Sequence, residues 1–87
     1  MPYRINLSPR ARRDLAKLPH PIRVQVRDRI DSLAVDPRPR GGKKLTGYTN
    51  RHRVKAGQYR IVYEIDDTVL LVSILTVAPR KSVYEDG

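Results

Sequence analysis

The chain has 87 residues, which is enough for one small domain with a modest hydrophobic core over residues 1–87. Its 18 Lys and Arg residues against 9 Asp and Glu residues give a net charge of +9, which favours a polyanionic partner such as nucleic acid. The absence of cysteine excludes disulfides and thiolate metal sites. No apolar run approaches the roughly 18 residues of a membrane span, and no leader-like segment opens the chain, so we expect a cytoplasmic protein.

The first part of the chain predicts a strand followed by two helices. Residues 3–7 alternate apolar and polar side chains, which is typical of a strand with one buried face. Ser8, followed by a proline, predicts the N-cap of a helix that ends near residue 17 and leaves Asp14 in solvent. A second helix over residues 21–34 carries an apolar stripe and should pack on a sheet.

A basic loop is expected over residues 35–44, because it holds two prolines and two glycines. A short strand could follow at residues 45–48. The loop contributes four cations that are candidates for tracking an RNA backbone, although basic loops without such a role are equally common. These candidates are Arg38, Arg40, Lys43 and Lys44.

Residues 51–65 predict a β-hairpin with a tight turn at Ala56, Gly57 and Gln58. Period-two alternation directs the cations of both strands to one face and the apolar side chains to the other. Because no acidic residue lies between Asp36 and Glu64, we expect this face to lack a counter-charge and to bind an external anion. Its cations are Arg51, Arg53, Lys55 and Arg60.

The most hydrophobic run of the chain, residues 69–77, predicts a central strand covered on both faces. The expected fold class is therefore α+β. An N-terminal strand is followed by a two-helix hairpin that packs on an antiparallel sheet, which a C-terminal three-stranded meander completes.

The residues favour phosphate chemistry performed by cations alone. The acidic residues and the two histidines form no recognisable metal-ligand set, and the glycines lack the spacing of a nucleotide-binding loop, so no metal or cofactor is expected. Clustered cations can stabilise the charge on a phosphodiester during cleavage. Lys55 is the candidate base, because a lysine can lose its proton more readily than an arginine, and Tyr84 could stack on a base. Binding of RNA or DNA without cleavage stays equally open at this point.

Several segments together resemble the RelE/ParE superfamily of toxin–antitoxin toxins. They are KLTG at 44–47, RHRVKAGQYRIVYEI at 51–65, the last hydrophobic strand, and APRKSVY at 78–84. The resemblance covers essentially the whole chain. Its GxYRIVY core is shared by gyrase-directed ParE proteins and ribosome-dependent RelE ribonucleases, whereas the cationic positions are similar to those of the RelE branch.

The resemblance to RelE implies an endoribonuclease that cleaves mRNA in the ribosomal A site and leaves a 2′,3′-cyclic phosphate. It implies Lys55 as general base on the 2′-hydroxyl and Arg80 as general acid toward the leaving 5′-oxygen. Arg53 and Arg60 would hold the scissile phosphate, and Tyr84 would stack on a codon base. Implied partners are mRNA, the 30S subunit and a cognate antitoxin, through which the complex would bind operator DNA.

One position departs from the RelE pattern. Thr46 stands where RelE proteins often carry an arginine, so a phosphate contact there would be lost or moved to Arg51. Two alternatives stay open: a ParE-like inhibitor of DNA gyrase and a non-catalytic RNA-binding module.

Overall fold

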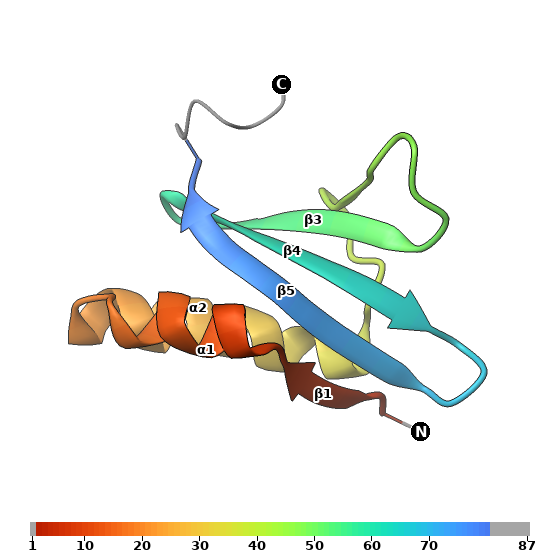
Figure 1. The fold of residues 1–87 in the computed structure, drawn as a ribbon, viewed down its shortest axis with the longest axis horizontal. Helices are drawn as coiled ribbons and strands as arrows, with labels where there is room; N and C mark the ends of the chain where they lie inside the picture. Colours follow the sequence, from red (N-terminus) through yellow and green to blue (C-terminus); the bar gives the residue numbers. More distant parts are fainter. Residues whose placement is uncertain (1, 81–87) are drawn as a thin grey trace.

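The computed structural model describes residues 2–80 as two helices packed on a five-stranded sheet. In chain order the elements are β1 (Arg4–Leu7), α1 (Pro9–Ala16), α2 (His20–Val35), β2 (Lys43–Lys44), β3 (Arg51–Ala56), β4 (Tyr59–Asp66) and β5 (Leu71–Pro79). Both helices lie along the same side of the sheet (Figure 1). The expected α+β class is confirmed.

The sheet has the strand order β1-β5-β4-β3-β2. Strands β3, β4 and β5 form the predicted antiparallel meander, but β1 pairs parallel to β5, so the sheet is mixed. The reason is topological. The chain leaves β1 through two helices that cross one face of the sheet and re-enters at the far edge as β2, and the meander then brings β5 back beside β1 in the same direction.

The core lies between the helices and one face of the sheet. Helix α2 contributes Val26, Ile30 and Leu33, which are buried against strand residues such as Ile61 and Tyr63. The other sheet face remains partly exposed, because burial alternates along each of the three meander strands. The expectation that β5 is covered on both faces is therefore wrong: helices cover only one of them.

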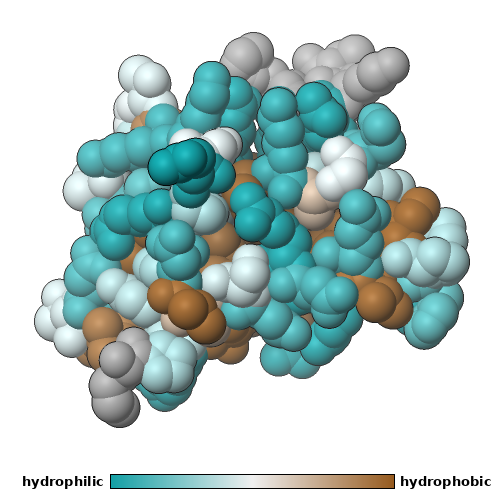
Figure 2. Space-filling view, turned by 180° about the vertical axis from the view of Figure 1, so that it is seen from behind, coloured by the Kyte–Doolittle hydropathy of each residue, from teal (hydrophilic) through white to brown (hydrophobic). Residues whose placement is uncertain are grey.

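The surface seen from behind is mostly hydrophilic, with hydrophobic side chains showing between the polar ones (Figure 2). Within residues 2–80, neither helix is long and apolar enough to cross a membrane. Four large apolar side chains are conspicuously exposed in this part of the chain, namely Val24, Val35, Tyr48 and Val69.

The start of α1 follows the prediction. Ser8 Oγ accepts a hydrogen bond of 3.0 Å from Ala11 N, which satisfies one of the free N–H groups of the first turn. The same hydroxyl donates to the carbonyl oxygen of Leu75 at 2.9 Å. The N-cap therefore also ties α1 to β5.

Asp14 does not lie in solvent as expected. Its Oδ2 atom accepts hydrogen bonds from Thr76 Oγ1 at 2.8 Å and from Val77 N at 2.9 Å. The pairing of β4 with β5 is irregular opposite Val62 and Tyr63, where β5 carries one extra residue. Such a bulge re-aims the strand, and here it turns β5 groups toward α1.

The loop between α2 and β3 differs in detail from the prediction. Lys43 and Lys44 form the short edge strand β2, whereas residues 45–48 form no strand. The strand lies earlier in the chain than expected, because Lys43 and Lys44 are the residues that pair with Arg53 and His52 of β3.

Candidate active site

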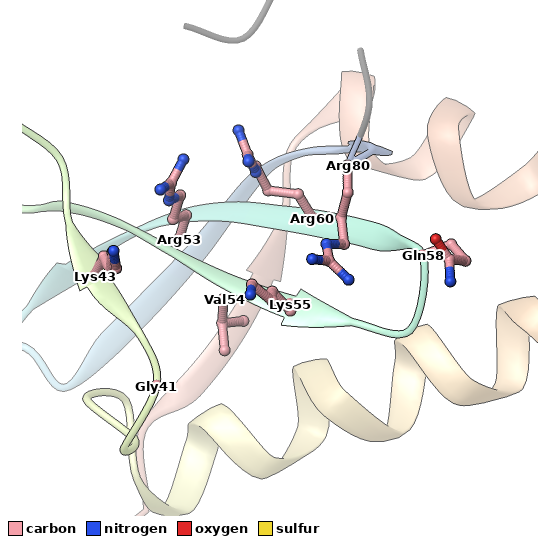
Figure 3. A pocket seen from close by; sticks show the side chains of 8 residues that line it. All are labelled: Gly41, Lys43, Arg53, Val54, Lys55, Gln58, Arg60 and Arg80. Carbon is pink, nitrogen blue, oxygen red and sulfur yellow. The ribbon is translucent and has the colours of Figure 1, made fainter. Parts of the chain in front are cut away.

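A cavity of about 360 Å³ opens on the sheet at the β3–β4 hairpin (Figure 3). Among residues 2–80, five cationic side chains line it, one from β2, two from β3, one from β4 and one just after β5, and no carboxylate does so. The cations are Lys43, Arg53, Lys55, Arg60 and Arg80. All of these except Lys43 are the cations that the resemblance to RelE groups around one phosphate.

Strand register places these cations directly opposite one another. Lys55 faces Arg60 across β3 and β4, and Lys43 faces Arg53 across β2 and β3. Like charges in opposing positions destabilise a sheet. The fold therefore holds two repulsive pairs at one cavity, and a bound anion would relieve both.

The turn of the hairpin organises the fifth cation. Gly57 adopts φ +60°, which a two-residue turn requires and which glycine tolerates best. Arg80 N donates to the carbonyl oxygen of Gln58 at 2.8 Å, and Arg80 Nη1 donates to that of Gly57 at 3.3 Å. The end of β5 is thereby fixed to the turn that separates Lys55 from Arg60.

Helix α2 supports the same hairpin from the other side. Arg29 Nε donates to the backbone carbonyl oxygen of Lys55 at 3.2 Å. The Gln25 side chain lies so close to the turn that a Cβ atom on Gly57 would come within 2.8 Å of its amide. Lys55 is therefore carried on a segment that helix α2 holds in place.

Two predicted RNA-binding arginines have counter-charges within the fold. Arg38 binds Asp67 through two hydrogen bonds of 2.8 and 3.2 Å, and Arg51 binds Glu64 with the same pair of distances. The expectation of a wholly unbalanced cationic face is therefore wrong at these positions. The register already places Arg51 opposite Glu64.

Three further predicted residues lie outside the cavity lining. Lys44 follows Lys43 along β2, so the two side chains point to opposite faces of the sheet. Arg40 is exposed in the loop and does not line the cavity. Tyr84 lies outside the described residues.

Sequence analysis missed three residues that line the cavity: Gly41, Val54 and Gln58. Gln58 had a usable signal, because it follows Gly57 in the predicted turn. Gly41 reaches the cavity only through the path of the α2–β2 loop, which no local pattern indicated.

His52 and Tyr63 lie on the opposite sheet face, where Tyr63 is buried in the core and His52 is half-buried beside it. Their rings stack with centroids 5.7 Å apart, and the Tyr63 hydroxyl donates to the carbonyl oxygen of Pro37 at 2.7 Å. Burial lowers the pKa of His52, and nearby Arg38 and Lys44 lower it further. Burial raises the pKa of Tyr63.

A polar cluster anchors the loop that leads to β2. The Tyr3 hydroxyl donates to Asp67 Oδ1 at 2.6 Å, beside the Arg38 pair. Hydrogen bonds from Arg38 and Tyr3 hold the pKa of Asp67 below its usual value. Across residues 2–80, no three His, Asp or Glu side chains cluster as metal ligands would.

Comparison with known proteins places this geometry in a family. The family model described as the ParE toxin of the type II toxin–antitoxin system parDE matches residues 5–84. The chain is 34% identical to toxin RelG of Mycobacterium tuberculosis, over 97% of this chain and 98% of that protein. It is 32% identical to toxin RelE of the same organism, over 95% of this chain and 87% of that protein.

Solved structures show the same fold. The toxin–antitoxin complex RelBE2 of M. tuberculosis matches with a TM-score of 0.82 and 36% identity, covering 92% of this chain and 100% of that one. The archaeal RelE–RelB complex of Pyrococcus horikoshii matches with a TM-score of 0.83 and 26% identity, covering 95% and 100%. The chain therefore belongs to the ParE toxin family of type II toxin–antitoxin systems, within the RelE/ParE superfamily.

Proposed function

We propose that the chain is a RelE-type toxin that inhibits translation as a ribosome-dependent endoribonuclease, cutting mRNA in the A site. The observation that carries this proposal is the cavity, which the described part of the chain lines with five cations and no carboxylate. Such a lining suits a phosphodiester, whose negative charge increases in the transition state of cleavage. RelE and RelG toxins among the relatives favour this branch over the gyrase-directed one.

The proposed reaction needs neither a metal ion nor a cofactor. The neutral Lys55 amine accepts the proton of a ribose 2′-hydroxyl, and the 2′-oxygen attacks the adjacent phosphorus. The bond from phosphorus to the 5′-oxygen breaks, Arg80 acts as the acid toward that leaving oxygen, and Arg53 and Arg60 hold the phosphate oxygens. The products are a 2′,3′-cyclic phosphate and a 5′-hydroxyl end.

Lys43 extends the assignment as a fifth contact to the RNA backbone. It lies opposite Arg53 on the edge strand and lines the same cavity. Two cations side by side at this edge suit the phosphate next to the one being cleaved. Tyr84 remains the proposed base-stacking residue of this site.

Ribosome dependence is part of the proposal because the cavity is open. Proximity and orientation account for a large share of catalysis, and a shallow site on a sheet does not by itself fix an RNA strand in line for attack. The 30S A site would supply that orientation. A cognate antitoxin is the proposed inhibitor, since the related toxins were solved as complexes with antitoxin. The complex would bind operator DNA through the antitoxin.

We propose that the toxin acts in the cytoplasm. The test is primer extension on mRNA translated by purified ribosomes. The wild-type chain should produce breaks in A-site codons, and Lys55→Ala and Arg80→Ala should each abolish them. Exposed cations of α1 and of its C-cap provide matched controls, so Arg13→Ala and Lys17→Ala should cleave like the wild type. Each variant is checked for folding by circular dichroism.

Two outcomes would replace the proposal. Inhibition of DNA supercoiling by gyrase, with mRNA intact and with Lys55 and Arg80 dispensable, would identify a gyrase-directed toxin instead. Binding of RNA that Lys55→Ala leaves unchanged, without any cleavage by the wild type, would identify a passive binder.

A further inference from the structure

A second cluster, made of Tyr48, Arg51 and Glu64, lies on the same sheet face as the cationic cavity. The guanidinium carbon of Arg51 lies 4.1 Å from the centroid of the Tyr48 ring. Arg51 Nη2 and Nε also donate to Glu64 Oε2 at 2.8 and 3.2 Å. Arg51 is thus neutralised by Glu64 and serves to support the aromatic ring.

Tyr48 is presented to solvent despite this support. Arg51 covers one face of its ring, yet 51% of the residue remains exposed. Tyr48 also lines a concavity of about 350 Å³, whose other lining residues include Glu64, Asp66, Leu71 and Ser73. A held, half-exposed aromatic ring beside an open recess is the arrangement that proteins use to stack unpaired bases.

The lining of this recess differs from that of the cationic cavity. No Lys or Arg side chain of the described residues lines it, and it offers carboxylate and hydroxyl oxygens beside an aromatic ring and a leucine. Acceptors around an apolar wall suit a flat ring that carries N–H donors. They do not suit a phosphate, which the carboxylates would repel.

The two sites lie within reach of one RNA strand. Arg51, Arg53 and Lys55 alternate along one face of β3, and Glu64 lies four residues beyond Arg60 on the same face of β4. Four residues of strand span about 13 Å. A strand whose phosphate occupies the cationic cavity can therefore place a base a few nucleotides away into the recess.

We propose that Tyr48 and Glu64 form a nucleobase subsite for an unpaired base that carries an exocyclic amino group. The base stacks on the uncovered face of Tyr48 and donates an amino hydrogen to Glu64. This inference rests on the proposed function, because the cationic cavity must hold the same RNA. The base belongs either to the mRNA or to ribosomal RNA exposed near the A site, and the experiment below separates these sources.

The first measurement is the kinetics of A-site cleavage by matched variants. Tyr48→Ala should raise KM by about fivefold to a hundredfold, the range expected for losing one base stack, with kcat nearly unchanged. Tyr48→Phe should restore the wild-type KM, because the ring remains. Val69→Ala is the control, since Val69 is also 51% exposed but does not line the recess.

The second measurement identifies the source of the base. A photoreactive p-azidophenylalanine in place of Tyr48 should crosslink to RNA on the programmed ribosome. A crosslink to mRNA, together with a single abasic mRNA position that removes the difference between wild type and Tyr48→Ala, assigns the base to the message. A crosslink to ribosomal RNA assigns it to the ribosome.

Failure of this subsite is distinguishable from failure of the proposed function. If the wild type cleaves mRNA but Tyr48→Ala has the wild-type KM, or position 48 crosslinks only to protein, the subsite is wrong and the nuclease stands. If the wild type cleaves no mRNA at all, the proposed function falls and the subsite falls with it.

Discussion

Arg29 of α2 and Lys55 of β3 are joined by a hydrogen bond of 3.2 Å from the guanidinium Nε to the backbone carbonyl oxygen. Strand β2 begins opposite Arg53 and runs away from Lys55, so this contact reaches the part of β3 that extends past its edge neighbour. Helix α2 thereby contacts β3 at the proposed catalytic lysine, where β2 does not pair with it. Arg29 is a positioning residue in this view, because it acts on Lys55 through the backbone and does not line the cavity.

We expect Arg29→Ala to lower the single-turnover cleavage rate by about tenfold to a hundredfold, since small displacements of a catalytic group are costly. The loss of one hydrogen bond should cost roughly 1 kcal/mol of stability. Arg29→Lys keeps a donor and should recover part of the rate. Cleavage kinetics and urea unfolding check these expectations.

The matched control for this prediction is Arg23→Ala on the same helix. Arg23 also donates to backbone carbonyls, those of Leu18 at 2.9 Å and Ala16 at 3.5 Å, but these lie at the end of α1. Its loss should reduce stability and leave the rate of the folded protein unchanged. Equal kinetic effects of Arg23→Ala and Arg29→Ala would show that neither arginine positions Lys55.

Asp14→Ala should be strongly destabilising. The carboxylate satisfies the backbone N–H of Val77 and the hydroxyl of Thr76 in a part-buried setting, and its removal leaves both donors without this partner. The expected cost is about 2 kcal/mol, measured as a lower urea midpoint. Asp28→Ala, which removes an exposed carboxylate of α2, should change stability by no more than about 0.5 kcal/mol.

His52 should make stability depend on pH. Burial lowers its pKa below the ordinary value of 6.5, assisted by Arg38 and Lys44 and opposed by Asp67. Below about pH 6.5 the unfolded chain therefore binds a proton that the folded chain resists, so stability is complete above that pH and falls as the pH drops.

His52→Phe retains a ring against Tyr63 and removes the titrating group. The difference in unfolding free energy between this variant and the wild type should grow in favour of the variant from pH 7.5 to pH 5.5. Urea titrations at several pH values measure it. That range lies above the ordinary Asp67 value of 3.8, so the Arg38 pair stays charged throughout. Parallel curves for the two proteins would contradict the prediction.

Gly57→Ala should destabilise the hairpin for two separable reasons. A side chain at φ +60° costs about 1 to 2 kcal/mol, and its Cβ would meet the Gln25 amide at 2.8 to 2.9 Å. The double variant Gly57→Ala with Gln25→Ala removes the clash and keeps the backbone cost. A double-mutant cycle by thermal unfolding should thus show partial recovery; simple additivity of the two changes would argue against the contact.

Local pattern predicted much of this structure correctly. Alternation around Gly57 predicted both hairpin strands and their faces, and the Ser8 signal predicted the start of α1. These features depend on neighbouring residues, whose spacing the sequence displays directly. The ion pair of Arg51 with Glu64 was also within reach, because a two-residue turn at Gly57 and Gln58 places these positions opposite each other. The linear sequence hides this pair, because Glu64 is distant from Arg51 along the chain and adjacent to it only across the paired strands.

Other features depended on segments that meet only in three dimensions. The parallel pairing of β1 with β5 follows from how the helices cross the sheet, which no short stretch encodes. Asp67 joins Tyr3 and Arg38 from three distant parts of the chain, and Asp14 finds its partners only because β5 bulges toward α1. Sequence pattern says which face a side chain takes, but not which remote group it will meet.

Strand β5 is the last of the seven described elements to be synthesised, yet it lies between β1 and β4 inside the sheet. A nascent or prematurely terminated polypeptide that stops before Leu71 leaves β1 and β4 without their shared partner strand and leaves their hydrophobic faces exposed. It also lacks Arg80. Such fragments should be degraded by proteases and should not cleave mRNA. On the proposed function, the chain therefore becomes toxic only after synthesis has passed Arg80.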